Sequence, residues 1–482
     1  MLNIAYHVQN RVLSAIGQAK YQLFDKHFIH TIRVGLVLTT VLLCLVMAFL
    51  IGYKGLIGLA VIGGVAAISA LVFAYAYTEY VVMALILTTT IIAPPIPRDV
   101  TTTLVLLLLL TLIWLSRLLL VERSFQSIRP APPNRYVVLF GIIVVISFIW
   151  SQLYVDPHIA YLQNSKLMPR IVTAIVMILS PVAMLLFGNF LNTIHQIRWI
   201  IWFYIGYGAI AIIPKFLDFS VPMNFNLGGQ LPVWVSIFAM GQVLFNERLL
   251  RWQRLVLLGI VGGWTYVQFF MGREWISGWA PLFLGLGIVV MLRSRAAFVV
   301  LVIIAVAYLI ADQDVLARLI EEESTISGET RLEAGNLAID IANGHFLFGT
   351  GPTGYYFYMA YILKDWFQLS HNNYVDIYAQ LGIFGFITWI AMWVSIGWLI
   401  WQTYRRLPKN GFVGGLTVSL FACFWVTLVL MMLGDWVIPF TYTQTMRGLS
   451  YTVWPWLWAG LAIALMHLWR QNKLSADPSQ ST

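Results

Sequence analysis

TTTLVLLLLLTLIWLSRLLLV, the stretch from Thr101 to Val121, decides the fold class of this chain. It contains one charged side chain, Arg117, and it has the length of about 20 apolar residues that a helix needs to cross a bilayer. A helix satisfies its own backbone hydrogen bonds, so hydrocarbon can surround it in place of water. The stretch therefore predicts a transmembrane helix.

Apolar side chains are just as common in the rest of the chain. They make up 60% of the 482 residues, charged residues make up 10%, and the mean hydropathy is +0.81. A typical soluble domain is about 45–50% apolar and about 25% charged. The 29 basic and 20 acidic side chains could not cover this much apolar surface in water, which excludes a soluble enzyme held by a single membrane anchor.

Fourteen apolar runs, several of them short, are candidate membrane helices. They cover residues 34–53, 55–77, 80–94, 101–121, 136–155, 171–191, 197–214, 231–246, 254–271, 275–292, 296–311, 377–402, 413–433 and 451–469. The run that ends at Pro94 has only about 15 residues and could be re-entrant. We expect an all-α membrane protein, a polytopic bundle of 12–14 transmembrane helices with one large extracytoplasmic helical loop.

Lys and Arg residues are divided unequally between the two sides of this predicted bundle. With the amino terminus in the cytoplasm, the inner segments hold 19 of the 29 basic residues and the outer segments hold 10. Cytoplasmic loops of membrane proteins carry such an excess of positive charge. We therefore expect both termini in the cytoplasm, and topology accounts for the net charge of +9 without a nucleic-acid partner.

The predicted organisation has five parts. They are a cytoplasmic amphipathic segment 1–33, amino-terminal transmembrane helices 34–311, an extracytoplasmic loop 312–376, three carboxyl-terminal transmembrane helices 377–469 and a cytoplasmic tail 470–482. Ile4, Val8 and Val12 fall near one helical face, as in a helix that lies on a membrane surface; a solvated arm is the alternative. Cys44 and Cys423 both lie in apolar runs and indicate neither a disulfide framework nor a metal site.

The loop 312–376 holds half of the acidic residues of the chain, and loops of this length are commonly functional. We expect it to fold as a cap of short helices over the bundle. Arg331 stands in the first turn of a predicted helix there, where the helix dipole disfavours a cation. A negative ligand would offset that cost, and a salt bridge to Glu329 or Glu333 is the alternative interpretation.

Two more features lie on the predicted outer face. Arg273 occupies a tight turn between two spans, where its guanidinium could bind a lipid phosphate, pair with Glu274 or reach lipid head groups. His371 comes directly before a predicted span, and its imidazole could take a proton from a hydroxyl near neutral pH or cap the span through hydrogen bonds. Upstream of it, Phe348–Tyr355 (FGTGPTGY) forms a sharp turn without the spacing of a phosphate-binding loop.

This part of the chain resembles a known family. The run from His371 to Gly385 is similar to the His-Asn-x-Tyr and Leu-Gly-x-x-Gly motifs of the bacterial O-antigen ligase and O-antigen polymerase superfamily. Arg331, the Gly-x-Gly-Pro turn and Arg273 follow the order of that family's upstream motifs. Two positions depart from it: Gln380 stands where many members carry glutamate, and Arg273 lacks the Ser-Arg-Gly setting.

The resemblance implies a function and a set of site residues. The expected activity is metal-independent, inverting transfer of a saccharide from an undecaprenyl-diphosphate carrier to an acceptor hydroxyl, without a cofactor, on the outer face of the cytoplasmic (inner) membrane. His371, Arg331 and Arg273 are the expected catalytic residues, and Arg273, Arg331, Asn372, Tyr374 and Gly351 are the expected substrate-binding residues. The acceptor is a glycan, a lipid or a protein.

Two alternatives to this ligase-like function stay open. A polymerase of the same fold would join one lipid-linked repeat to another, and the sequence does not reveal the acceptor. A flippase or transporter of lipid-linked saccharides would be expected to carry charged groups inside its spans and inverted repeats. The sequence shows neither feature, so the enzyme is the favoured interpretation.

Overall fold

The structure is a computed structural model that describes residues 74–90, 100–164, 167–217, 229–272, 275–311, 329–363 and 369–474. Contacts within the chain define two compact units, Met1–Ala76 and Tyr77–Thr482. Only three residues of the first unit are described, and all of the helices named here belong to the second. The predicted amphipathic segment 1–33, the candidate span 34–53 and nearly all of the candidate span 55–77 lie outside the described residues.

The described residues form helices joined by turns, without strands, which confirms the predicted all-α fold class. The α-helices are α3 (Thr78–Thr88), α4 (Thr102–Ser116), α5 (Asn134–Leu153), α6 (Ala160–Asn164), α7 (Leu167–Phe190), α8 (Ile194–Ala211), α9 (Ile213–Leu217), α10 (Leu231–Phe245), α11 (Arg251–Tyr266), α12 (Ile276–Arg293), α13 (Arg295–Ala311), α15 (Glu329–Gly344), α16 (Gly354–Leu363), α17 (Asn373–Arg406), α18 (Gly411–Leu433), α19 (Thr441–Gln444), α20 (Leu449–Thr452) and α21 (Trp454–Arg470). Two π-helical turns, Arg117–Val121 and Val267–Met271, extend α4 and α11, and a 3-10 turn, Met446–Gly448, precedes α20.

Eight of the helices in the described residues are long and apolar enough to cross a membrane. The bent pair Met446–Thr452 and Trp454–Arg470 adds a ninth if it forms one span. Three shorter apolar helices are Thr78–Thr88, Leu231–Phe245 and Arg295–Tyr308. The chain is therefore a multi-pass membrane protein, and the number of full-length spans in this part of it is lower than the 12–14 predicted for the whole.

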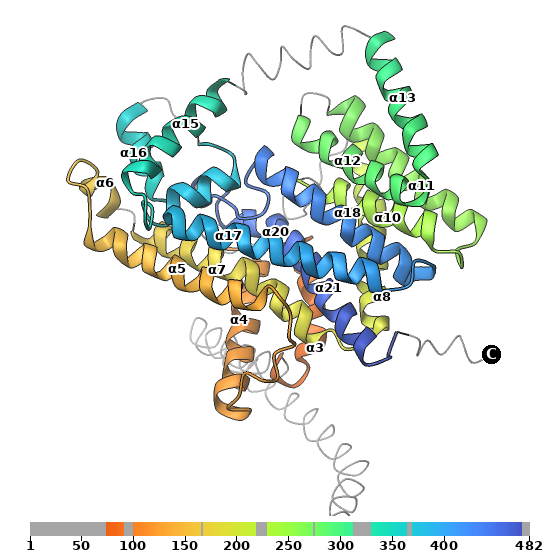
Figure 1. Cartoon of the computed structure of the whole chain (residues 1–482), viewed down its shortest axis with the longest axis horizontal. Helices are drawn as coiled ribbons and strands as arrows, with labels where there is room; N and C mark the ends of the chain where they lie inside the picture. Colours follow the sequence, from red (N-terminus) through yellow and green to blue (C-terminus); the bar gives the residue numbers. More distant parts are fainter. Residues whose placement is uncertain are drawn as a thin grey trace, which may run out of the picture. The chain divides into compact units, whose positions relative to one another are not determined.

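The bundle is held together by apolar and aromatic side chains along α7, α8, α10, α17, α18 and α21. At its centre the Trp458 ring lies 5.0 Å from Tyr204 and 4.8 Å from Phe238, both edge-on. All three side chains are buried. Edge-to-face aromatic pairs add about 0.5–1.5 kcal/mol each beyond the area that they bury. α5 runs alongside α17 at the edge of this core (Figure 1).

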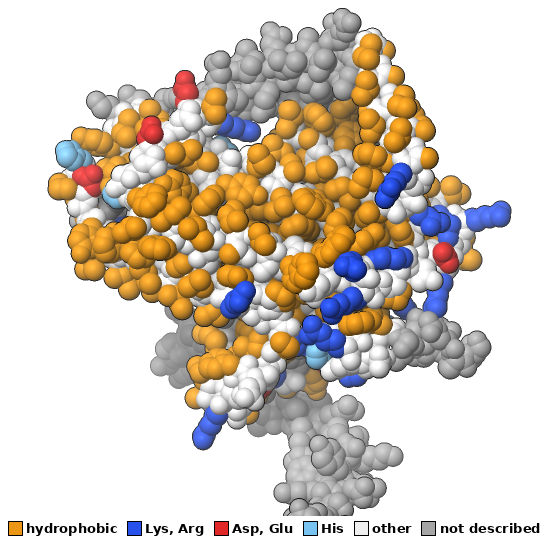
Figure 2. All heavy atoms as spheres, viewed as in Figure 1, with side chains coloured by type: hydrophobic (Ala, Val, Ile, Leu, Met, Phe, Trp, Pro, Cys, Tyr) orange, Lys and Arg blue, Asp and Glu red, His pale blue; other side chains and the backbone are white. Residues whose placement is uncertain are grey.

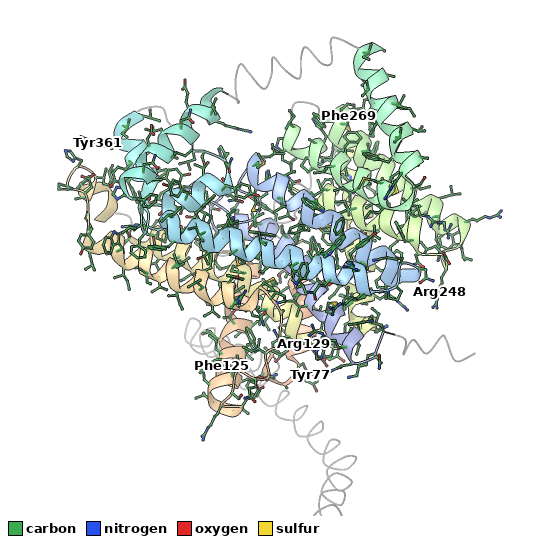
Figure 3. The ribbon with its side chains drawn as sticks, in the orientation of Figure 1. Tyr77, Phe125, Arg129, Arg248, Phe269 and Tyr361 are labelled. Carbon is green, nitrogen blue, oxygen red and sulfur yellow. The ribbon has the colours of Figure 1, made fainter. Side chains whose placement is uncertain are left out.

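The bundle has two ends, which α17 and α18 define because they run in opposite directions. The His371 end is the end at which α17 begins and α18 finishes, and the Arg406 end is the end at which α17 finishes and α18 begins. Figure 2 shows Lys and Arg side chains over the Arg406 end, and acidic side chains over α15 and α6 at the other. Figure 3 marks the same division with Arg248 on one side and Tyr361 of α16 on the other.

A small second core covers the His371 end. α15 and α16 contact the first turns of α17 through buried side chains that include Ala338, Tyr355, Leu369, Ala379 and Phe440. The part of the predicted outer loop that the structure describes thus folds as helices over the start of α17 (Figure 1).

Candidate active site

The candidate site is built around a break in α17. Gly382 has a φ of 66° inside that helix, so the hydrogen-bond ladder stops there and the two parts of α17 meet at a kink. A positive φ is inexpensive only for glycine. A Cβ atom on Gly382 would lie 2.4 Å from the Leu347 carbonyl oxygen, so the neighbouring backbone also excludes every other residue.

The loop before α16 supplies hydrogen-bond partners at this break. The Thr350 and Gly351 N–H groups donate to the carbonyls of Ala379 and Gln380 at 3.0 and 2.9 Å, and the Ile383 N–H donates to Phe346 at 2.8 Å. The Gly-x-Gly-Pro turn and the Leu-Gly break, two motifs quoted separately from the sequence, therefore form one unit.

The side chain of Gln380 connects the Gly-x-Gly-Pro turn to α17 by hydrogen bonds. Its Oε1 accepts from the Thr353 N–H at 2.7 Å, and its Nε2 donates to the Asp376 carbonyl at 3.1 Å. Its backbone carbonyl accepts from Ser147 Oγ of α5 at 2.9 Å. A carboxylate at position 380 would lose the N–H donor, so glutamine suits the contacts that this chain makes.

His371 stands at the start of α17 in a strained conformation. Its φ is 45°, in the left-handed region that residues other than glycine seldom adopt. The next residue, Asn372, holds the helix start, because its Oδ1 accepts from the N–H groups of Tyr374 and Val375 at 3.0 and 3.4 Å. Strain of this kind, about 1–3 kcal/mol, persists where surrounding contacts hold it and is common at functional sites.

Asp435, in the turn after α18, faces His371. His371 Nδ1 lies 3.3 Å from Asp435 Oδ2, and the side chains are 28% and 1% exposed. Asn373 holds the turn in place, because its Nδ2 donates to the Ile438 carbonyl at 2.8 Å and its Oδ1 accepts from the Val437 N–H at 3.0 Å. Asn373, two residues after His371, therefore positions the turn that carries the carboxyl facing His371.

A second carboxyl, that of Asp376, lies behind Asp435. Its Oδ1 accepts from Ser370 Oγ at 2.7 Å and from the Tyr355 hydroxyl. The side chain of Asp376 interacts with that of Asp435 and acts to lower the pKa of Asp435.

Arg331 of α15 completes the charged group. Its Nε is buried and has no hydrogen-bond partner among the described residues. Its positive charge reaches both His371 and Asp435, because it lowers the pKa of each. The structure thus brings together Arg331 and His371, 40 positions apart in the sequence.

Burial sets the protonation of the two facing groups. It lowers the pKa of His371 below its ordinary value, with Asp376 acting against and Arg331 adding to that shift. Burial also raises the pKa of Asp435 to about 6, while the interaction with Asp376 and the charge of Arg331 limit the rise. At neutral pH, His371 is therefore neutral and Asp435 is charged, so Nδ1 carries the proton toward Asp435 and Nε2 remains to accept another.

Arg273, the other predicted catalytic arginine, lies outside the described residues, as does Glu274. The described residues that follow it do reach the site. The Trp275 ring lies 5.7 Å from that of Trp436, the neighbour of Asp435, and Ser277 Oγ donates to the Leu433 carbonyl at 3.0 Å. The start of α12 is thus in contact with the Asp435 turn.

The three remaining predicted substrate-binding residues have structural contacts. Asn372 caps α17, as described above, and the Tyr374 hydroxyl donates to the Leu428 carbonyl of α18 at 3.1 Å. Gly351, with a φ of 84°, lies against Ser151 and Arg170. In their described contacts, these three residues hold the helices and turns around His371 in place.

Sequence reasoning missed Asp435 and Arg170. Asp435 is the only acidic residue between Asp376 and Asp477, directly after an apolar helix, which is a signal that could have singled it out. Arg170 is 1% exposed at the start of α7, and its Nη2 donates to Ser151 Oγ at 2.5 Å behind the Gly351 turn. No local pattern links either residue to His371.

In the described ranges, no three His, Cys, Asp or Glu side chains come close enough to hold a metal ion. A scan against protein-family models found no match to this chain, and a search of curated proteins found none either.

Proposed function

We propose that the protein is a membrane-embedded group-transfer enzyme whose site is the His371 end of the bundle. More specifically, we propose an O-antigen ligase-like glycosyltransferase that moves a saccharide from an undecaprenyl-diphosphate carrier to an acceptor hydroxyl. The observation that carries the proposal is the contact of a strained, largely buried His371 with the buried Asp435, within reach of the charge of Arg331. The resemblance of the surrounding motifs supplies the substrate class.

In the proposed reaction, the acceptor, the donor, His371 and Asp435 each have a defined role. The acceptor oxygen attacks the anomeric carbon of the donor sugar from the face opposite the leaving group and forms the new glycosidic bond with inversion. The bond from that carbon to the diphosphate oxygen breaks, and undecaprenyl diphosphate departs with its electron pair. His371 Nε2 accepts the acceptor proton, while Asp435 holds Nδ1–H and stabilises the imidazolium that forms.

The arginines act on the leaving group. Negative charge concentrates on the diphosphate as the bond breaks, so fixed guanidinium groups stabilise the transition state more than the bound donor. Arg331, whose buried Nε lacks a described partner, is assigned to this role together with Arg273. Nothing in this scheme requires a metal.

The proposed location is the cytoplasmic (inner) membrane, with both termini in the cytoplasm and the His371 end on the outer side. The separation of charge supports it, since the basic turns around Arg248, Arg293 and Arg406 all lie at the other end of the bundle. Basic residues of membrane proteins are concentrated on the cytoplasmic side. Lipid-linked saccharide and membrane lipid are accordingly the proposed partners.

The test is the product made by the purified protein from a defined undecaprenyl-diphosphate oligosaccharide, with and without an acceptor. A single transfer to the acceptor supports a ligase. A ladder of lengthening lipid-linked chains supports a polymerase of the same fold. If the protein instead moved the intact lipid-linked glycan across a vesicle membrane and transferred no saccharide, the proposal would be overturned in favour of a flippase.

A further inference from the structure

The Arg406 end of the bundle contains a cavity with a volume of about 980 Å³. Its walls come from the start of α8, the turn from α10 to α11, the turn from α17 to α18 and the end of α21. Sites for small molecules commonly have volumes of about 300–1,000 Å³. The cavity lies at the opposite end of α17 from His371 and has no part in the chemistry proposed above.

The charge of the cavity is positive. Arg198, Arg248 and Arg406 line it against one carboxylate, Glu247, so the ionised lining residues sum to +2. Arg198 lies over the Phe412 ring at 5.4 Å, and Arg406 lies over the Trp469 ring at 5.7 Å. A guanidinium that rests its face on a ring keeps its edge, with its fork of N–H donors, suited to an anion such as phosphate.

An apolar groove of about 230 Å³ adjoins this cavity and is lined mainly by α11. Trp202, Leu249 and Gln253 line both spaces, so the two lie side by side. The groove also includes Trp252 and Val256, whose side chains are 60% and 54% exposed on the outer surface of an apolar helix. An arginine-lined cavity therefore opens beside an apolar channel on a surface suited to lipid.

We propose that this cavity and groove bind a phospholipid with an anionic head group. The arginines take the phosphate, and an acyl chain lies along the groove between Trp202 and Val256. A soluble phosphate would use the cavity alone and leave the groove without a function, so the two adjacent spaces favour a lipid. Basic pockets between membrane helices on the side of anionic lipids are recognised binding sites for such head groups.

The test compares lipid binding by native mass spectrometry of the full-length protein, with phosphatidylglycerol against phosphatidylcholine. We expect one phosphatidylglycerol to bind at least about tenfold more tightly than phosphatidylcholine, which corresponds to about 1.4 kcal/mol. Arg406→Gln should remove that preference. Arg405→Gln is the matched control, because Arg405 is the neighbouring cation at the same helix end and does not line the cavity.

Two further variants and a competition with inorganic phosphate also test the proposal. Arg406→Lys keeps the charge without the planar fork and should retain part of the preference even if Arg406→Gln folds poorly. Val256→Asn should weaken lipid binding, whereas it would leave a purely soluble anion unaffected. Any of three results would overturn the proposal. They are equal affinity for the two lipids, equal effects of Arg405→Gln and Arg406→Gln, and full displacement of the lipid by inorganic phosphate.

Discussion

The two ends of the bundle carry charged side chains in opposite ways. At the His371 end, Asp376 and Asp435 are almost fully buried, and burial raises the pKa of Asp435. At the Arg406 end, Arg248 and Arg406 are exposed and Arg406 rests on an aromatic ring. Buried and coupled groups are suited to moving protons, whereas exposed cations are suited to holding an anion. Substitutions at the two ends should therefore have different effects.

The largest effect is expected from His371→Asn. Asparagine tolerates the positive φ at this position, so the backbone should persist while the base is lost. Because general base catalysis contributes about 10²–10⁴-fold, we expect the transfer rate to fall by about 10³-fold. The control is His345→Asn, a histidine at the same end whose ring lies beside Tyr358. If His371→Asn kept nearly the wild-type rate, His371 would not be the catalytic base.

Arg331→Gln should have the next largest effect. Loss of one fixed donor to a developing negative charge costs about 10²–10³-fold in rate. Because the role is specific to the transition state, the affinity for undecaprenyl diphosphate should fall much less than the rate. The transfer rate of Arg331→Lys should lie between those of the wild type and Arg331→Gln. An affinity that fell as far as the rate would mean that Arg331 only binds the carrier.

Asp435→Asn should lower the rate by about tenfold to a hundredfold, less than loss of the base itself, because the amide keeps the shape and loses the charge that stabilises the imidazolium. Asp156→Asn is the control, since Asp156 is a partly exposed carboxylate at the same end whose Oδ1 lies 2.9 Å from His158 Nδ1. If both variants lowered the rate equally, the contact with His371 would have no special role.

The pH dependence follows from the same pair. Burial lowers the pKa of His371 and raises the pKa of Asp435 to about 6, and the reaction needs both groups deprotonated. The transfer rate should therefore be highest above these pKa values and should fall as the pH drops through about 6. Asp435→Asn should change the acid limb of the profile. A limb centred above the ordinary histidine pKa of about 6.5 would contradict these shifts.

Gly349→Ala should have a smaller effect, expressed mainly as lost stability. A Cβ at that position would lie 2.4 Å from the Gln380 carbonyl carbon, and the φ of 67° is strained for alanine. We expect a loss of about 1–3 kcal/mol, measured by thermal unfolding in detergent. Gly335→Ala is the control, because a Cβ there meets nothing within 4 Å. Equal stability of both variants would show that the paired turn does not require glycine.

The membrane helices could be predicted from the sequence because length and apolar composition determine them locally. The predicted span 377–402 lies within α17, Asn373–Arg406, which begins earlier because Asn372 caps it. The break at Gly382 was outside that reasoning, since the N–H groups that approach it come from a loop about 30 residues away.

The site was predictable only in part. The motifs pointed to His371 and Arg331, and the structure brings these two together. Asp435 stands 64 positions from His371 in the chain, and only the return of α18 beside α17 makes them neighbours. Contacts of that kind depend on helix packing, which composition and spacing do not specify.

The most direct test of the central claim is to map where the donor binds. An undecaprenyl-diphosphate saccharide with a photoreactive group on its first sugar would be crosslinked to the full-length protein, and the labelled peptides would be identified by mass spectrometry. The account predicts labels in peptides around Arg331, His371 and Asp435, at the His371 end. Labels confined to the Arg406 end, or spread along the length of the bundle as in a translocation path, would contradict it.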